Sequence, residues 1–499
     1  MDYSIMLLWT LMVWACIHLL FLARKRGLSN GKLPPGPIPL PILGSLFKLG
    51  SKPNESLAQL AKKYGPLMTL KLGSTTMIVV SSSIMAKEVL QKNDQSFSGR
   101  RVFDAVRALN FHESSIVWSQ PTTRWRKLRT IFNTEMFTTA RIASNQGLRH
   151  KKVQDLIAHI QEDRLARRAV DIGQATFTTT LNLTSNTVFS VDLVDPNSKS
   201  AQDFKDLVWE LLKESGRPNL VDYFPVLRPI DPQGIRRRIA ANLKKLYAIF
   251  DRLIDERMLS TSTSSDSPRR NDFLDVLLNE KDENGLQLGR QDILPILTDI
   301  FIAGTDTSST AVEWAMAELL HNPNAMAKAR FELKETIGLG QQVKESDIIR
   351  LPYLQAIVKE TLRLHPPGPL FPRRTIADVE VHGFSIPKNT WITMNVWAIG
   401  RDPNVWAEPA SFLPERFLDS DIDFKGQDFE LIPFGSGRRI CPGLPLAFRM
   451  VHLLLASFLH SFDWKLPNGM MPQDMDMSSK FGITLQLATP LRAIPALND

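Results

Sequence analysis

The chain has 499 residues, of which 43% are hydrophobic and 22% are charged, a balance that permits large buried cores and excludes a disordered or collagen-like chain. Its net charge of +8 fits an anionic membrane or an acidic protein partner, and no zinc-finger spacing or basic-aromatic motif indicates nucleic acid. Two cysteines, Cys16 and Cys441, exclude a disulfide framework and fit a reducing compartment such as the cytosol.

The chain opens with an apolar segment, residues 3–23, which is followed at once by Arg24, Lys25 and Arg26. About 20 apolar residues can cross a bilayer as one helix. The basic cluster after the segment predicts that the rest of the chain lies in the cytosol. A cleaved signal peptide would carry its positive charges before the apolar run. We therefore expect a single transmembrane anchor over 3–23.

Residues 24–51 form a basic and proline-rich stretch that includes Leu33-Pro34-Pro35-Gly36-Pro37. Prolines fix the backbone angle φ and lack a hydrogen-bond donor, so this stretch should be stiff and extended. We interpret it as a hinge between the anchor and a catalytic body over 52–499. Recruitment of a proline-binding module is the alternative.

The body is predicted to be mainly helical, with short strands near each end. Alternating β-branched residues predict a hairpin from Leu67–Leu72 and Thr76–Ser81, and later strands at Glu380–Pro387 and Trp391–Asn395. The polar segment Ser260–Asn271 is typical of a mobile surface loop. No linker divides the body into independent domains.

One long helix is expected over Ile293–Leu320. It is not a second membrane span, because Pro295, Asp299 and Gly304 interrupt its apolar run. Pro295 removes a helix hydrogen bond, which predicts a bend or a late helix start there.

Ala303-Gly304-Thr305-Asp306-Thr307 lies inside this helix. Gly304 removes a side chain where a flat ligand could approach, and Thr307, three residues on, shares its face. The Thr307 hydroxyl can bond a backbone carbonyl and open the helix locally. Asp306 points elsewhere and can link the site to solvent as a proton relay. The alternative is a polar pair on a helix surface.

Two further pairs share a helix face. Trp125 and Arg129 are four residues apart, and Glu360 and Arg363 are three apart. Taken alone, a pair such as Glu360–Arg363 is usually a surface ion pair of small energetic value.

The segment Phe434–Gly443 reads Phe-Gly-Ser-Gly-Arg-Arg-Ile-Cys-Pro-Gly. Its glycines let the backbone fold tightly, and a helix is expected to begin directly after Gly443. Backbone N–H groups at the start of that helix would favour a thiolate at Cys441. The alternative for an isolated cysteine is a buried free thiol beside a glycine-rich turn.

The segment meets the whole pattern Phe-x-x-Gly-x-Arg-x-Cys-x-Gly, and on this match the chain resembles the cytochrome P-450 superfamily. The resemblance extends over essentially the full chain. It is greatest to plant endoplasmic-reticulum enzymes of the group that includes geraniol hydroxylases and abietane diterpenoid oxidases. Three stretches carry the similarity to that group: 231–234, 432–439 and 462–466.

The resemblance implies the cytochrome P-450 fold, mainly α with small β-sheets, and a haem b cofactor, iron protoporphyrin IX, whose iron is held by Cys441. A thiolate ligand favours O–O cleavage. Asp306 and Thr307 are the implied catalytic pair that delivers protons. The other implied cofactor-binding residues are Trp125, Arg129, Gly304, Arg373, Phe434 and Arg439. Arg374 adjoins Arg373 and could exchange roles with it.

The resemblance also implies that Glu360 and Arg363 form a buried trio with Arg416, which has a structural role behind the haem. Arg124, Arg126, Lys127 and Arg438 would gather on the cysteine side, where a basic concavity suits an acidic reductase. A solvated charged face is the alternative for this group of residues.

The implied function is hydroxylation of a lipophilic terpenoid, with O2 and with electrons from NADPH through NADPH–cytochrome P-450 reductase, at the endoplasmic-reticulum membrane. A monoterpenol and an abietane-type diterpenoid both remain open, and a phenylpropanoid or a xenobiotic is a further alternative. The rival functions are a same-fold dehydratase or isomerase, and a non-catalytic haem protein. Substrate contacts are expected from 101–117, 219–229, 367–371 and 481–484 and from the helix face formed by Ile300, Ala303, Gly304, Thr307 and Ser308. Many of these residues could equally be plain core.

Overall fold

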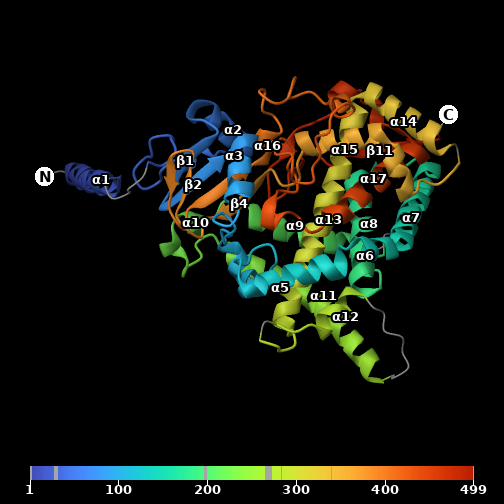
Figure 1. Ribbon diagram of the computed structural model, residues 1–499, viewed down its shortest axis with the longest axis horizontal. Coiled ribbons are helices and arrows are strands. Elements are labelled where there is room, and N and C mark those ends of the chain that lie inside the picture. Colours follow the sequence, from blue (N-terminus) through green and yellow to red (C-terminus); the bar gives the residue numbers. More distant parts are fainter. Residues whose placement is uncertain are drawn as a thin grey trace.

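The computed structural model describes residues 3–26, 32–195, 199–263, 272–282, 284–338 and 340–497. Helices form most of the body, and a β-rich part lies on the side nearest the N-terminal helix (Figure 1). The helices are α1 Tyr3–Arg26, α2 Pro53–Tyr64, α3 Ser83–Lys87, α4 Phe111–Ser114, α5 Thr123–Ile131, α6 Thr139–Ser144, α7 Gln146–Leu165, α8 Ile172–Phe189, α9 Lys199–Gly216, α10 Leu220–Tyr223, α11 Ile235–Thr263, α12 Phe273–Asn279, α13 Arg290–His321, α14 Pro323–Ile337, α15 Pro352–Leu364, α16 Val396–Ile399 and α17 Leu444–Ser461.

The main sheet has the strand order β1-β2-β7-β4, in which β2 and β7 are parallel and the other pairs antiparallel. Three smaller sheets are β3-β11-β8, β9-β10 and β5-β6. The strands are β1 Leu67–Leu72, β2 Thr75–Val80, β3 Val170–Asp171, β4 Leu370–Arg374, β5 Val379–Val381, β6 Phe384–Ile386, β7 Trp391–Asn395, β8 Asp463–Lys465, β9 Ser479–Lys480, β10 Gln486–Leu487 and β11 Arg492–Ala496.

The predicted β1–β2 hairpin and the strand at β7 are confirmed. The segment Glu380–Pro387 is not one strand, because β5 and β6 form a hairpin that turns at His382 and Gly383, both with positive φ. Helix α11 continues to Thr263, so the start of the predicted loop Ser260–Asn271 is helical. Residues 264–271 of that loop lie outside the described residues.

Helix α13 crosses the body and packs on α8, α17 and α15 (Figure 1). It begins at Arg290, after the N-cap Gly289, so the prediction of a late start at Pro295 is wrong. A proline near the N-terminus removes only one hydrogen bond and has a φ that suits a helix, which is why the helix continues through it. Trp314 and its apolar neighbours on α13 are fully buried in the largest core.

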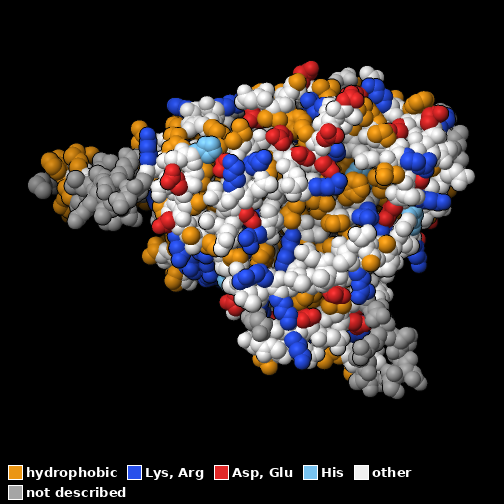
Figure 2. All heavy atoms as spheres, in the orientation of Figure 1, with side chains coloured by type: hydrophobic (Ala, Val, Ile, Leu, Met, Phe, Trp, Pro, Cys, Tyr) orange, Lys and Arg blue, Asp and Glu red, His pale blue; other side chains and the backbone are white. Residues whose placement is uncertain are grey.

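Helix α1 covers the predicted anchor segment. Its large apolar side chains from Tyr3 to Trp14 are exposed and lie outside the body (Figure 2). Among the described helices, α17 has the length and hydropathy of a membrane span, but 56% of it is buried inside the protein. We therefore assign α17 to the core. The stretch Tyr3–Cys16 of α1 is apolar but shorter than a full span.

Part of the predicted hinge belongs to the body by its contacts. Thr69 N donates to Pro35 O (2.8 Å), and Ser45 N donates to Lys71 O (2.5 Å), so the segment lies along β1. A side chain on Gly36 would place its Cβ 1.8 Å from Thr69 O, so only glycine permits this approach.

Candidate active site

The cysteine loop is a tight turn that presents Cys441 three residues before α17 begins at Leu444. Cys441 N donates to Phe434 O (3.0 Å), which closes the loop. Gly437 has φ +69°, and a Cβ there would lie 2.3 Å from Leu90 O. The predicted tight packing of the glycines and the position of Cys441 before a helix are confirmed.

Cys441 is half-buried, and desolvation of its thiol raises its pKa above the ordinary value. The backbone N–H groups of Gly443 and Leu444 and the charge of Arg129 act in the opposite direction. The sequence-based expectation named the N–H contribution and omitted the larger cost of burial. A metal ion removes this conflict, because a coordinating thiol is deprotonated outright.

Cys441 lines a cavity of ≈ 350 Å³. Helix α13 supplies another part of its wall through Ala303, Gly304 and Thr307, and the first two are exposed although they lie in mid-helix. A Cβ on Gly304 would have Thr184 Oγ1, at 3.8 Å, as its nearest neighbour. The wall is therefore open at Gly304, as the sequence predicted.

Thr307 donates its hydroxyl to Ala303 O (2.6 Å), which confirms the predicted bond to a helix carbonyl. Its oxygen keeps lone pairs that can accept a hydrogen bond from within the cavity.

Asp306 does not line this cavity and is only 2% exposed. Gln486 Nε2 donates to Asp306 Oδ1 (3.1 Å). Burial raises the pKa of Asp306 to about 6, against the effect of neighbouring polar side chains. Asp306 therefore points away from Thr307, as predicted, but it has almost no direct contact with solvent.

Four arginines gather at the cavity: Arg100, Arg129, Arg373 and Arg439. Burial lowers the pKa of each, to about 10 for Arg100, to about 8 for Arg439 and well below the ordinary value for Arg373, and mutual repulsion adds to the effect at these three. Nε and Nη1 of Arg373, Nη1 of Arg439 and Nε of Arg100 have no hydrogen-bond partner among the described residues. Such a cluster fits an anionic ligand, because buried cations need counter-charges and acceptors.

The sequence predicted three of these four residues and missed Arg100. Arg100 donates to Pro372 O (2.7 Å) and belongs to no motif, so only its place beside β4 reveals it. Arg374 lies outside the cavity and donates to Gln120 Oε1 (3.0 Å), so Arg373 is the residue placed at the site.

Trp125 lines the cavity, but its indole N–H is donated to Ile116 O (3.0 Å). The Arg439 guanidinium lies over its ring at 4.2 Å, a cation–π contact that steadies the arginine. Contact of Trp125 with a haem propionate stays a prediction. Phe434 also lines the cavity and packs on Phe424.

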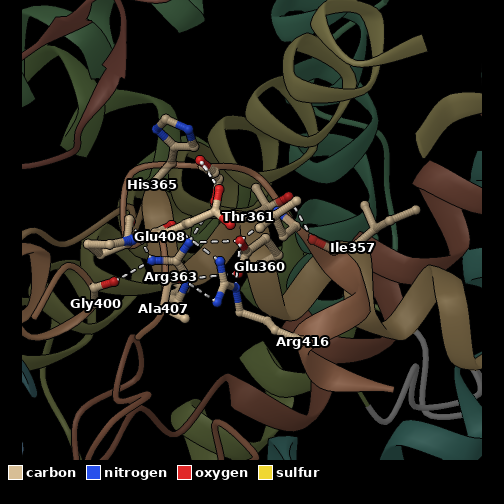
Figure 3. A network of polar contacts seen from close by, with 12 residues as sticks. Ile357, Glu360, Thr361, Arg363, His365, Gly400, Ala407, Glu408 and Arg416 are labelled. Atoms are coloured by element: carbon tan, nitrogen blue, oxygen red, sulfur yellow. Dashed lines mark hydrogen bonds and ion pairs between the residues drawn. The ribbon is translucent and has the colours of Figure 1, made fainter. Parts of the chain in front are cut away.

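Glu360, Arg363 and Arg416 come together in a buried network away from the cavity lining (Figure 3). Arg363 makes two bonds of 2.7 Å to the Glu360 carboxylate, and both side chains are 0% exposed. Arg363 also donates to three backbone carbonyls, those of Gly400, Pro409 and Ser411. Arg416 Nε completes the trio at 3.1 Å from Glu360 Oε1.

Most predicted substrate segments contribute to the cavities. A second cavity of ≈ 150 Å³ shares Val117, Asp299, Ala303 and Thr307 with the first. It is lined mainly by apolar residues of α9, α11 and α13, with Thr484 and a few other polar groups. The segment 219–229 lines neither cavity, because it packs on the β1–β2 turn, where Ser74 N donates to Tyr223 O (2.9 Å).

Asp299 is a site residue that sequence reasoning noted only as an interruption of an apolar run. It lines both cavities, and burial raises its pKa to about 7. Its carboxylate accepts from Ser115 Oγ (2.9 Å) and Ile116 N (2.6 Å), which fixes the loop before α5 against α13. Only the fold places an aspartate of α13 against this loop.

The basic residues expected on the cysteine side are largely paired. Arg124 contacts Asp292, Lys127 Nζ lies 3.1 Å from Glu280, and Arg438 lies 3.2 Å from Asp94. Arg126 is exposed. The surface therefore mixes both charges, and the predicted basic concavity stays untested.

The family model for Cytochrome P450 matches residues 34–490. The chain is 51% identical over 495 residues to geraniol 8-hydroxylase of Swertia mussotii, which covers 99% of this chain and 98% of that protein. It is 51% identical over 497 residues to geraniol 8-hydroxylase of Catharanthus roseus, covering 99% and 100%. Drimenol monooxygenase of Persicaria hydropiper is 47% identical over 496 residues, covering 99% and 97%.

The chain therefore belongs to the cytochrome P450 family. It is a monooxygenase of that family, and membership implies a haem iron and a redox partner that supplies electrons.

Proposed function

We propose that this chain is a membrane-anchored monooxygenase that hydroxylates a lipophilic terpenoid, with haem b held at the ≈ 350 Å³ cavity. The observation that carries the proposal is the convergence of one half-buried cysteine and four arginines on that cavity, of which Arg373 and Arg439 are buried. Haem b presents an iron that a thiolate can bind and two carboxylates that arginines can pair with.

Cys441 is the proposed iron ligand, and Arg100, Arg129, Arg373 and Arg439 are the proposed partners of the two carboxylates. The bound haem supplies oxygen activation and the insertion of one oxygen atom into a C–H bond. The chain's own contribution is orientation and proton control. The apolar lining excludes water, and the Thr307 hydroxyl, which donates to Ala303 O, can accept a hydrogen bond from within the cavity. Behind it Asp306, with a pKa of about 6, can take up and release a proton.

The terpenoid assignment draws on the relatives, whose names specify geraniol and drimenol as substrates. The second cavity is apolar and measures ≈ 150 Å³. An apolar cavity of about 150 Å³ accommodates benzene, so a chain of ten carbons would extend from it toward Thr307 in the main cavity. We therefore propose a monoterpenol as the first substrate class, and an abietane-type diterpenoid as the larger alternative.

We propose that residues 3–23 anchor the protein in the endoplasmic-reticulum membrane with the body, 52–499, in the cytosol. The exposed apolar side chains of α1 support an anchor. Residues 24–51 connect the two parts, and their contacts with β1 fix the end of the connection on the body. NADPH–cytochrome P450 reductase is the proposed electron donor.

The test uses full-length, haem-loaded protein with its reductase. We expect a reduced carbon monoxide complex with the absorption typical of thiolate-ligated haem, and NADPH- and O2-dependent hydroxylation of geraniol. Cys441→Ser should remove both, while Cys16→Ser should remove neither, since Cys16 lies in the exposed helix α1.

Retention of the thiolate spectrum in Cys441→Ser would refute the ligand assignment. A product formed without O2 or NADPH would instead favour a same-fold dehydratase or isomerase. A panel of monoterpenols and abietane diterpenes, each assayed by mass spectrometry, distinguishes the two substrate classes.

A further inference from the structure

Glu313 is a carboxylate of α13 that the mechanism above does not use. It lies seven residues after Asp306, so the two side chains project from one helix face about 10 Å apart along the axis. Thr310 lies between them on the same side of the helix and is 3% exposed. The face therefore presents a carboxylate, a hydroxyl and a second carboxylate in a row.

The two carboxylates are held by one C-terminal segment. Gln486 Nε2 donates to Asp306 Oδ1 (3.1 Å), and Leu491 N donates to Glu313 Oε1 (3.0 Å). A Cβ on Gly173 of α8 would lie 2.8 Å from the Glu313 carboxyl atoms, so the glycine makes room for this group. Glu313 is thus enclosed by α8 and the last strands, yet it keeps some exposure while Asp306 is 2% exposed.

Both acids are protonated more readily than ordinary carboxylates. Burial raises the pKa of Glu313 to about 7, and the negative charges of Asp171 and Asp306 add to this effect. Leu491 N–H and the charge of Lys205 from α9 act in the opposite direction. The pKa of Asp306 is about 6. Both groups therefore exchange protons close to neutral pH.

We propose that Glu313 is the outer residue of a proton route that enters the protein beside α8 and reaches Asp306 past Thr310. The proton leaves the Glu313 carboxyl, passes through water and the Thr310 hydroxyl, and forms the O–H bond of Asp306. Solvent then reprotonates the Glu313 carboxylate. Water is required, because a span of about 10 Å exceeds one hydrogen bond.

Transfer of the proton from Glu313 to Asp306 is unfavourable, because the pKa of Glu313 is the higher of the two. Consumption of the proton at Asp306 drives further proton transfer from Glu313. The inference rests on the proposed function, because only a monooxygenase needs protons at Thr307. Glu313 acts through Asp306, so it is a proton-relay residue and not a catalytic one.

The test compares Glu313→Gln, which keeps an acceptor for Leu491 N–H, with Glu332→Gln. Glu332 is a matched control, because it is a half-buried glutamate of α14 that accepts from Tyr353 N (2.7 Å) and Leu354 N (2.9 Å) and lies away from both cavities. Both variants should keep the carbon monoxide spectrum of the parent.

We expect Glu313→Gln to lower product formation about 3–10-fold, which is below the range for loss of a directly acting acid because water can replace an outer group. The solvent isotope effect should rise, and the pH profile should lose its inflection near the Glu313 pKa of about 7. Thr310→Val should act in the same direction, and Glu313→Asp should restore the inflection.

An infrared pH titration of the loaded protein provides a readout independent of turnover. Asp299, whose pKa is also about 7, contributes to the protonated-carboxyl absorption that titrates near pH 7. The absorption should therefore decrease in Glu313→Gln by the contribution of one carboxyl, and it should keep the parental amplitude in Glu332→Gln. A parental isotope effect, pH profile and carboxyl titration in Glu313→Gln would overturn the inference. If Asp306→Asn is impaired in that case, the proposed function stands. Absence of a thiolate spectrum in the parent protein would instead refute the proposed function.

Discussion

Two groups of buried arginines in this molecule differ in how their charges are balanced. Arg363 is surrounded by acceptors from the chain itself: a carboxylate on one side and three carbonyls on the other (Figure 3). Arg373 and Arg439, at the cavity, retain donors that have no partner in the part of the chain that the structure describes, and burial lowers their pKa values. A buried ion that is complete within the chain serves the fold, whereas one that lacks acceptors indicates a place for an anionic ligand.

The largest effect on stability is expected in the network of Glu360, Arg363 and Arg416, whose charges are balanced within the chain. Glu360→Gln leaves Arg363 and Arg416 without their shared counter-charge, and loss of one partner of a buried pair costs about 3–5 kcal/mol. We expect this loss in the free energy of unfolding, measured by urea denaturation. Glu415→Gln is the control, because its ion pair with Lys328 is exposed and should cost at most about 1 kcal/mol. Equal losses of unfolding free energy in the two variants would contradict the larger contribution assigned to the buried network.

The next largest effect is expected on haem binding, at Arg373 in the arginine cluster that lines the cavity. Arg373→Met removes a buried cation whose proposed partner is a haem carboxylate. A hydrogen bond to a charged group contributes about 1.5–3 kcal/mol, so haem should bind roughly 10–150-fold more weakly. The haem-free protein should be as stable as the parent or more so, because the uncompensated charge is gone. Haem transfer to apomyoglobin measures the first quantity and urea unfolding the second. Arg374→Met, outside the cavity, should change neither by much.

A smaller effect should depend on pH. Burial raises the pKa of Asp306 to about 6, so the folded chain binds its proton more tightly than the unfolded chain, whose ordinary value is 3.8. Asp306 is therefore compatible with folding at low pH, where it is protonated, and the stability of the folded chain decreases as pH rises from about 4 to 6. Above that range the buried carboxylate costs up to about 3 kcal/mol.

Asp306→Asn keeps an acceptor for Gln486 and removes the charge, so we expect it to be more stable than the parent at pH 8 and similar at pH 4. Urea unfolding at both pH values measures the difference, while hydroxylation should fall. Glu360→Gln should be destabilising at both pH values. A lower stability of Asp306→Asn at pH 8 would contradict the cost assigned to its carboxylate.

The smallest effect is expected at the surface near the cysteine loop. Arg126→Glu should change the stability by at most about 0.5 kcal/mol, because the residue is exposed. If this face binds the reductase, the rate of first-electron transfer should fall and should depend less steeply on ionic strength. Stopped-flow reduction measures that rate. A parental rate would favour the solvated charged face.

Motifs with local spacing were predicted well from the sequence. Cys441 follows a glycine loop and precedes a helix, and Gly304 and Thr307 occupy one face of another, because helical periodicity and glycine's conformational freedom act over a few residues. Residues without a motif were not predicted. Arg100 and Asp299 become site residues only because distant segments fold against them. The expectation for the pKa of Cys441 was incomplete for the same reason, since burial is a property of the whole fold.

The sequence by itself determined the family, the cysteine loop and the residue types that the chemistry needs, because these are encoded in short spacings and local backbone preferences. Only the tertiary structure decided which arginine of an adjacent pair enters the cavity, which acids are buried and which buried charges lack a partner. Burial and pairing depend on contacts between segments hundreds of residues apart, and these contacts set the energies of the charged groups.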